Sequence, residues 1–249
     1  MNTPDPRAIE QLTAVLAALD EELDWPRLGA SYCEGNARTF FDEARRAHML
    51  DVGLQLVDAV AAGLPARGPR RSLYLGAALA ELGPMLVERL VLAREVRWFN
   101  LPGPELDELT RALERVGNSL GLRLPRPDPT PLAEVAPQPC DHLWLVSVLS
   151  DPDAFPALHD ELYERAGTPQ ATGRGDLTAE RARAEALLDA ALGWRAGECL
   201  LTTSTDELPL IEARCTAHGL RLEAHRELPT SALVGDTLCS VRLTAHRAQ

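Results

Sequence analysis

The sequence of 249 residues contains no lysine, so every basic side chain other than histidine is an arginine. Without lysine the chain cannot form a Schiff base, use a lysine general base or hold a phosphate with a P-loop lysine. No segment runs for 18 apolar residues, as a membrane-spanning helix requires, and the first residues lack the basic and then apolar pattern of a secretory leader. We therefore expect a protein with no membrane segment and no export signal.

Metal-binding and disulfide patterns are also missing. The five cysteines form no C-x-x-C pair and the six histidines no H-x-x-x-H pair, so we expect no metal site. Scattered cysteines with no disulfide framework fit a reducing, cytoplasmic location. The cysteines are Cys33, Cys140, Cys199, Cys215 and Cys239.

Positive charge is scarce, with 25 arginines against 37 acidic residues and a formal net charge of −12. Nucleic acids and anionic membranes bind basic surfaces, so both are disfavoured as partners, although a local basic patch would still be compatible with this balance. The 45% hydrophobic and 25% charged residues are typical of a folded globular protein. The length suits one large α/β domain with an extension, which we prefer to two small domains.

The first 70 residues are expected to form a helical extension of a domain that covers residues 71–249. Apolar residues recur at helical spacing over 7–24 and again over about 37–62, where the pattern fits two packed helices or one helix bent near Gly53. A linker rich in proline and glycine follows. The extension either caps the cleft of the domain or forms a homodimer interface, and the sequence does not choose between them.

From Ser72 onward, short apolar runs alternate with helical segments, which predicts a mostly parallel sheet with helices on both faces. We predict strands near 72–76, 95–100, 120–124, 142–148 and 198–203. Helices are predicted near 79–93, 104–118, 153–165, 178–192 and 206–218.

The end of the chain departs from this alternation. Residues 220–228 and 237–245 are strand-like with no helix between them, so they should pair as an antiparallel hairpin. The prediction is therefore an α/β fold with seven strands, the last two in this hairpin. The proline-rich residues 125–139 are expected to form an extended loop rather than a helix.

Parallel strands closed by a C-terminal hairpin resemble the class I S-adenosylmethionine-dependent methyltransferase family, over about residues 72–245. In that family the first strand ends in hydrophobic-Asp-hydrophobic-Gly-x-Gly-x-Gly. This chain reads Leu-Tyr-Leu-Gly-Ala-Ala-Leu-Ala at the corresponding place. Gly76 matches the first glycine, Tyr74 stands at the acidic position, and Ala78 and Ala80 replace the later glycines.

The resemblance implies S-adenosylmethionine as cofactor. Asn100 stands where the family has an acid for the ribose hydroxyls, and Asp128 is the residue available near the adenine position. Ser147 follows the fourth strand, at the carboxyl edge where open α/β sheets bind ligands. The predicted cofactor-binding residues are Tyr74, Gly76, Ala78, Asn100, Leu101, Asp128 and Ser147.

These residues also have structural explanations. Gly76 suits a packed turn, Tyr74 suits a core position, Asn100 tolerates unusual turn geometry, and Asp128 suits an exposed loop. Three hypotheses therefore remain open. The first is a methyltransferase for a small-molecule substrate, with its catalytic residues unidentified. The second is a non-catalytic module that has lost the cofactor, and the third, which fits least, is a nicotinamide-dependent oxidoreductase.

Overall fold

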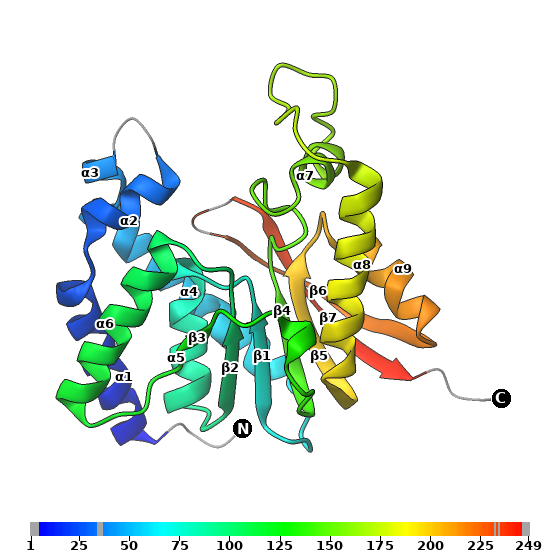
Figure 1. Ribbon diagram of the computed structural model, residues 1–249. Helices are drawn as coiled ribbons and strands as arrows, with labels where there is room; N and C mark the ends of the chain where they lie inside the picture. The colour runs from blue at the N-terminus through cyan, green and yellow to red at the C-terminus, as the bar shows by residue number, and fades with distance from the viewer. Residues whose placement is uncertain (1–4, 34–36, 232, 234, 246–249) are drawn as a thin grey trace.

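The computed structural model describes residues 5–33, 37–231, 233 and 235–245. It contains a seven-stranded sheet in the order β3-β2-β1-β4-β5-β7-β6 (Figure 1). β1 to β5 run parallel to one another, and β7 is antiparallel to both β5 and β6. The predicted fold class is confirmed. The strands are Arg71–Leu75 (β1), Glu95–Phe99 (β2), Pro127–Asp128 (β3), Cys140–Leu145 (β4), Arg195–Ser204 (β5), Leu220–Thr230 (β6) and Thr237–Ala245 (β7).

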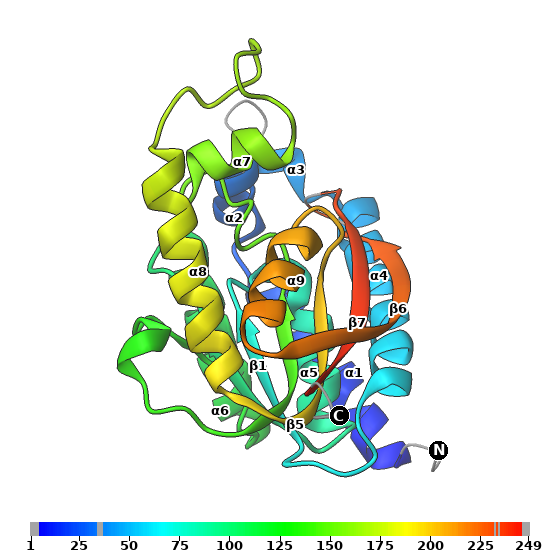
Figure 2. The ribbon, with the colours of Figure 1, turned by 90° about the vertical axis from the view of Figure 1, so that its right-hand side faces the viewer.

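Helices cover both faces of the sheet (Figure 2). One face carries the N-terminal helices with α5 and α6, and the other carries α7, α8 and α9. The helices are Pro6–Glu22 (α1), Trp25–Tyr32 (α2), Ala37–Phe40 (α3), Glu43–Gly63 (α4), Leu82–Leu90 (α5), Pro104–Leu120 (α6), Pro156–Leu162 (α7), Leu177–Gly193 (α8) and Leu208–Ala217 (α9). Two 3-10 turns, η1 and η2, occupy Leu79–Glu81 and Leu132–Glu134.

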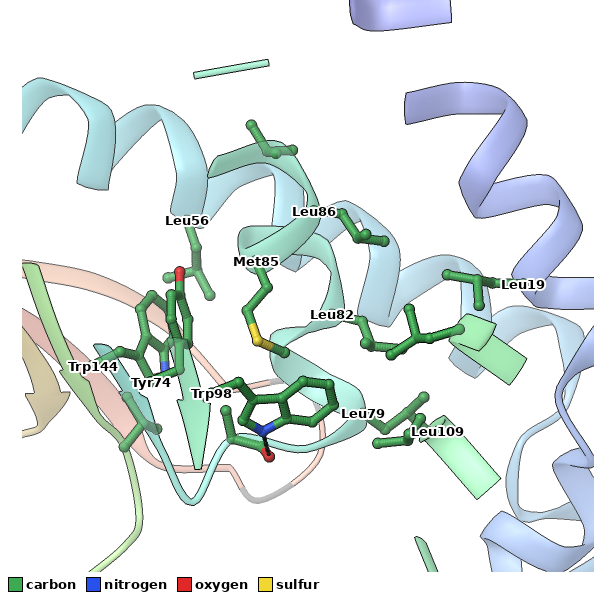
Figure 3. Packing of buried hydrophobic residues seen from close by; sticks show 14 of the residues in the cluster. Leu19, Leu56, Tyr74, Leu79, Leu82, Met85, Leu86, Trp98, Leu109 and Trp144 are labelled. Atoms are coloured by element: carbon green, nitrogen blue, oxygen red, sulfur yellow. Dashed lines mark hydrogen bonds between the residues drawn. The ribbon is translucent and has the colours of Figure 1, made fainter. Parts of the chain in front are cut away.

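The N-terminal helices share a core with the sheet. Leu12, Val15 and Leu19 of α1 belong to the same buried cluster as Trp98 and Trp144 of the strands, and Figure 3 shows Leu19 on the outer side of α5. Burial of such side chains stabilises the fold by about 2 kcal/mol each. The division of the chain at residue 70 stays a prediction, and its outer ends, residues 1–4 and 246–249, lie outside the described part.

Two sequence predictions were wrong in detail. The third strand is not at 120–124, because α6 continues to Leu120 and ends where Gly121 adopts a φ of +66°. The strand instead lies inside the proline-rich loop, where Pro127 pairs with Trp98. An edge strand tolerates a residue without an N–H group.

The second difference concerns the N-terminal segment. The structure has a helix at Trp25–Tyr32 that the sequence pattern did not predict. Over residues 37–63 it has two helices, α3 and α4, and α4 runs through Gly53. Gly53 faces Gly83 of α5, where an added Cβ would lie 3.7 Å from the Gly83 Cα. This glycine therefore permits a close approach of two helices. None of the helices in the described ranges is long and apolar enough to cross a membrane.

A buried carboxylate joins α5 to the sheet. Glu88 is 1% exposed and accepts hydrogen bonds from Ser72, from the Tyr74 hydroxyl at 2.7 Å and from Arg94 Nε at 2.9 Å. His142 Nδ1 of β4 lies 2.7 Å from the same carboxylate. Although burial opposes ionisation, these partners lower the pKa of Glu88 to about 2.

We predict that Glu88 makes the fold sensitive to acid. The folded-state pKa lies below the unfolded value of 4.5, so its contribution is present above pH 4.5 and is lost as the pH falls toward 2. In urea titrations, the free energy of unfolding should fall by about 3 kcal/mol more in the wild type than in Glu88→Gln over this range. Glu10→Gln, a change at an exposed glutamate, should behave as the wild type does. Parallel pH profiles for the wild type and Glu88→Gln would contradict the prediction.

Candidate functional site

The turn after β1 begins with Gly76, which is exposed and adopts a φ of +64°. Its N–H donates to the Phe99 carbonyl of β2 at 2.9 Å, which ties the turn to the neighbouring strand. An added Cβ would lie 2.8 Å from Val148 Cγ2, in the segment after β4. Both the backbone conformation and the space therefore require glycine here.

The carbonyl of Ala77 is the next fixed point of the turn. It accepts a hydrogen bond from Trp98 Nε1 at 2.7 Å and from Asn100 Nδ2 at 2.8 Å. Figure 3 shows the Trp98 indole below Met85. Two donors from the end of β2 therefore hold the turn in place, and Trp98 is one that the sequence analysis missed.

Asn100 uses both ends of its amide. Its Oδ1 accepts the N–H of Leu101 at 2.7 Å while its Nδ2 donates to Ala77, so the hydrogen bonds define the orientation of the amide. The Asn100 N–H donates to the carbonyl of Asp128 at 3.3 Å. The structure thus brings Gly76, Asn100 and Asp128 to the carboxyl ends of β1, β2 and β3.

The other predicted residues are placed differently. The Leu101 side chain is 66% exposed beside Asn100. The Asp128 carboxylate accepts the N–H of Thr130, and hydrogen bonds from the side chain and the backbone of Thr130 lower the pKa of Asp128. Tyr74 is fully buried, stacks on Trp144 with 5.1 Å between ring centroids and donates its hydroxyl to Glu88. The Tyr74 hydroxyl therefore points into the core, and Tyr74 is a core residue rather than a cofactor contact.

Two glutamates meet the backbone of the turn beyond Ala77. The N–H of Ala78 donates to Glu81 Oε2 at 2.8 Å, and the N–H of Leu79 donates to Glu105 Oε1 at 3.1 Å. Burial raises the pKa of both carboxyls, that of Glu81 to about 7. Neither glutamate was among the site residues predicted from the sequence. The spacing of Glu81, three residues after Ala78, is the available signal, since a glutamate there commonly caps the start of a helix.

Ser147 faces the opposite half of this edge. It adopts a φ of +55°, which is rare for a residue with a side chain, and its hydroxyl donates to Asp236 Oδ2 at 2.6 Å. Asp236 also accepts a hydrogen bond from the Tyr163 hydroxyl at 2.8 Å and is 7% exposed. Ser147 therefore lies at the predicted edge with its hydroxyl committed to the residue that precedes β7.

The buried Glu207 secures the segment after β4. It accepts the N–H groups of Leu149 at 2.5 Å and Ser150 at 3.0 Å, and burial raises its pKa to about 7. Among the described residues, no group of three or more histidine, cysteine, aspartate or glutamate side chains could hold a metal ion. The edge is therefore built from backbone groups, amides, hydroxyls and carboxylates.

Comparison with known proteins gives a match in fold alone. No protein-family model and no curated protein matches the sequence. The structure of magnesium protoporphyrin IX methyltransferase from Synechocystis PCC 6803 with bound S-adenosylhomocysteine aligns with a TM-score of 0.51 at 11% identity, over 93% of this chain and 99% of that chain. The same enzyme with bound S-adenosylmethionine gives 0.49 at 15% identity, over 90% and 98%. The pyocyanin biosynthetic protein PhzM gives 0.49 at 13% identity, over 85% and 59%.

The first of these alignments and the strand order agree. This chain has a class I S-adenosylmethionine-dependent methyltransferase-like fold. The structural alignment supports the fold, but at 11% identity it says nothing about the substrate of this chain.

We predict that Gly76→Ala costs more stability than a matched glycine change. The left-handed backbone costs an alanine about 1 kcal/mol, and the contact with Val148 should add about as much again. Gly121 has nearly the same φ of +66° but nothing within 4 Å of an added Cβ, so Gly121→Ala should cost only the backbone term. Equal losses in urea denaturation would show that Val148 does not press on the turn.

We predict that Asn100→Asp destabilises the turn, although it introduces the acid that the methyltransferase family, which the sequence resembles, has at this position. A carboxylate at Asn100 would face the Ala77 carbonyl where the amide now donates a hydrogen bond. The expected loss in the free energy of unfolding at pH 8 is about 1–2 kcal/mol. Gln11→Glu adds the same charge at an exposed position and should change the stability by less than about 0.5 kcal/mol. A stability of Asn100→Asp equal to that of the wild type would refute this account.

Proposed function

We propose that this protein binds S-adenosylmethionine at the carboxyl edge of its sheet and transfers the methyl group to a small molecule. The order of the strands across the sheet carries the proposal. From β1 the chain first adds strands on one side, β2 and β3, and then crosses to the other side with β4. In open α/β sheets ligands bind at such a switch point, outside the carboxyl ends of the strands. The exposed Gly76 lies at this point and is held against β2.

The residues around the turn suit a nucleoside. Asn100 keeps one N–H of its amide and one lone pair of its oxygen free of the hydrogen bonds described above, so it can bond to ribose hydroxyls. The exposed Leu101 offers an apolar surface to a base, and Asp128 lies on the adjoining strand. We assign the cofactor to Gly76, Ala78, Asn100, Leu101 and Asp128, with Ser147 at the border with the methyl acceptor.

Methyl transfer from this cofactor requires few catalytic groups from the protein. The bound cofactor would supply an activated methyl group on a positively charged sulfur. In the transfer, the methyl carbon forms a bond to the acceptor while its bond to sulfur breaks. The electron pair of the broken carbon–sulfur bond stays on sulfur. Alignment of the reacting atoms accounts for much of such catalysis. The task of this chain is therefore to hold donor and acceptor in line and exclude water.

Titration calorimetry with S-adenosylmethionine and S-adenosylhomocysteine tests the proposal. Micromolar binding by the wild type, weakened about tenfold or more in Gly76→Ala and unchanged in Gly121→Ala, would support it. The weakening is expected because an added methyl displaces Val148 and alters the turn. Absence of binding at high micromolar ligand would refute the proposal and favour the non-catalytic module.

A further inference from the structure

The backbone donors next to Gly76 already have partners within the protein. Ala78 and Leu79 direct their N–H groups at the carboxylates of Glu81 and Glu105. N–H groups at the start of a helix attract anionic ligand groups. A ligand carboxylate at this turn would therefore compete with two protein carboxylates for the same donors.

Glu105 is held from a third element. The hydroxyl of Tyr32, the last residue of α2, donates to Glu105 Oε1 at 2.6 Å, while Glu105 itself lies in the first turn of α6. The Tyr32 ring stacks on Phe40 at 5.7 Å and meets Phe41 edge-on at 5.4 Å. An aromatic group of the N-terminal segment thereby fixes the carboxylate that covers Leu79.

The local charges oppose an anion. Glu81 is 9% exposed, and its pKa is raised first by burial and further by the nearby Glu105. The Tyr32 hydroxyl, whose pKa burial and the same two glutamates raise, stays protonated and donates to Glu105. A ligand carboxylate brought to Leu79 would be repelled by Glu105 unless Glu105 moved away.

We propose that Tyr32 and Glu105 form an autoinhibitory contact that keeps the turn after β1 closed to a carboxylate-bearing ligand until Glu105 withdraws from Leu79. The inference rests on the proposed function, since it concerns access to the same turn. It also gives the N-terminal helices a role, because movement of α2 would release Glu105. The extension then acts on cofactor affinity through one hydrogen bond.

The test compares two compounds that differ by one carboxylate. S-adenosylhomocysteine carries the carboxylate, and S-adenosyl-3-thiopropylamine lacks it. Glu105→Ala should tighten S-adenosylhomocysteine by about tenfold and leave the amine within about twofold, a typical coupling between two sites. Tyr32→Phe should tighten it by about threefold, because Glu105 keeps its bond to Leu79 but loses its anchor. Asp107→Ala, an exposed change in the same first turn of α6, should alter neither affinity.

The outcomes separate this inference from the proposed function. If Glu105→Ala leaves S-adenosylhomocysteine unchanged, weakens it, or tightens both compounds equally, the inference is overturned while cofactor binding stands. If neither compound binds any variant, the proposed function fails. Hydrogen exchange at the Leu79 amide then tests whether Glu105 protects this N–H group. Exchange that is faster in Glu105→Ala than in Asp107→Ala supports the contact, and unchanged exchange overturns it.

Discussion

The buried carboxylate of Glu88 is the interaction on which the arrangement of the sheet depends. It collects hydrogen bonds from β1 and β4 and an ion pair with Arg94, which also contacts Asp141. Such a cluster is costly to bury and is stable only when every member is paired. It fixes the depth of α5 relative to β1, and therefore the place where the turn after Leu75 emerges.

The same cluster gives Tyr74 a structural role near the end of the first strand. Tyr74 occupies that position and points into the core, where its hydroxyl reaches the Glu88 carboxylate. The turn is then held by neutral donors, Trp98 and Asn100, which both bond to the Ala77 carbonyl. The turn keeps a defined shape because Trp98 of β2 and Asn100, directly after β2, hold the Ala77 carbonyl.

The carboxyl edge is divided into two halves with different chemistry. Around Gly76 the groups are backbone N–H donors, an amide, the buried Glu81 and the partly buried Glu105. Around Ser147 they are the hydroxyls of Ser147 and Tyr163, which donate to Asp236. The backbone that follows Ser147 is held by Glu207, which accepts the N–H groups of Leu149 and Ser150. Parallel strands bring these groups together, because residues distant in sequence meet wherever the strands end at one edge.

The sequence alone determined the alternation of strands and helices, the terminal hairpin and the position of Gly76, because periodicity and turn residues are local signals. It misplaced β3, since a two-residue edge strand with a proline carries almost no pattern. Only the tertiary structure decided that Tyr74 lies in the core and that Asn100 donates to the Ala77 carbonyl. It also decided that Glu105 accepts hydrogen bonds from both the Leu79 N–H and the Tyr32 hydroxyl. Each of these contacts joins residues 14 to 73 positions apart, and such pairings depend on how the helices pack on the sheet.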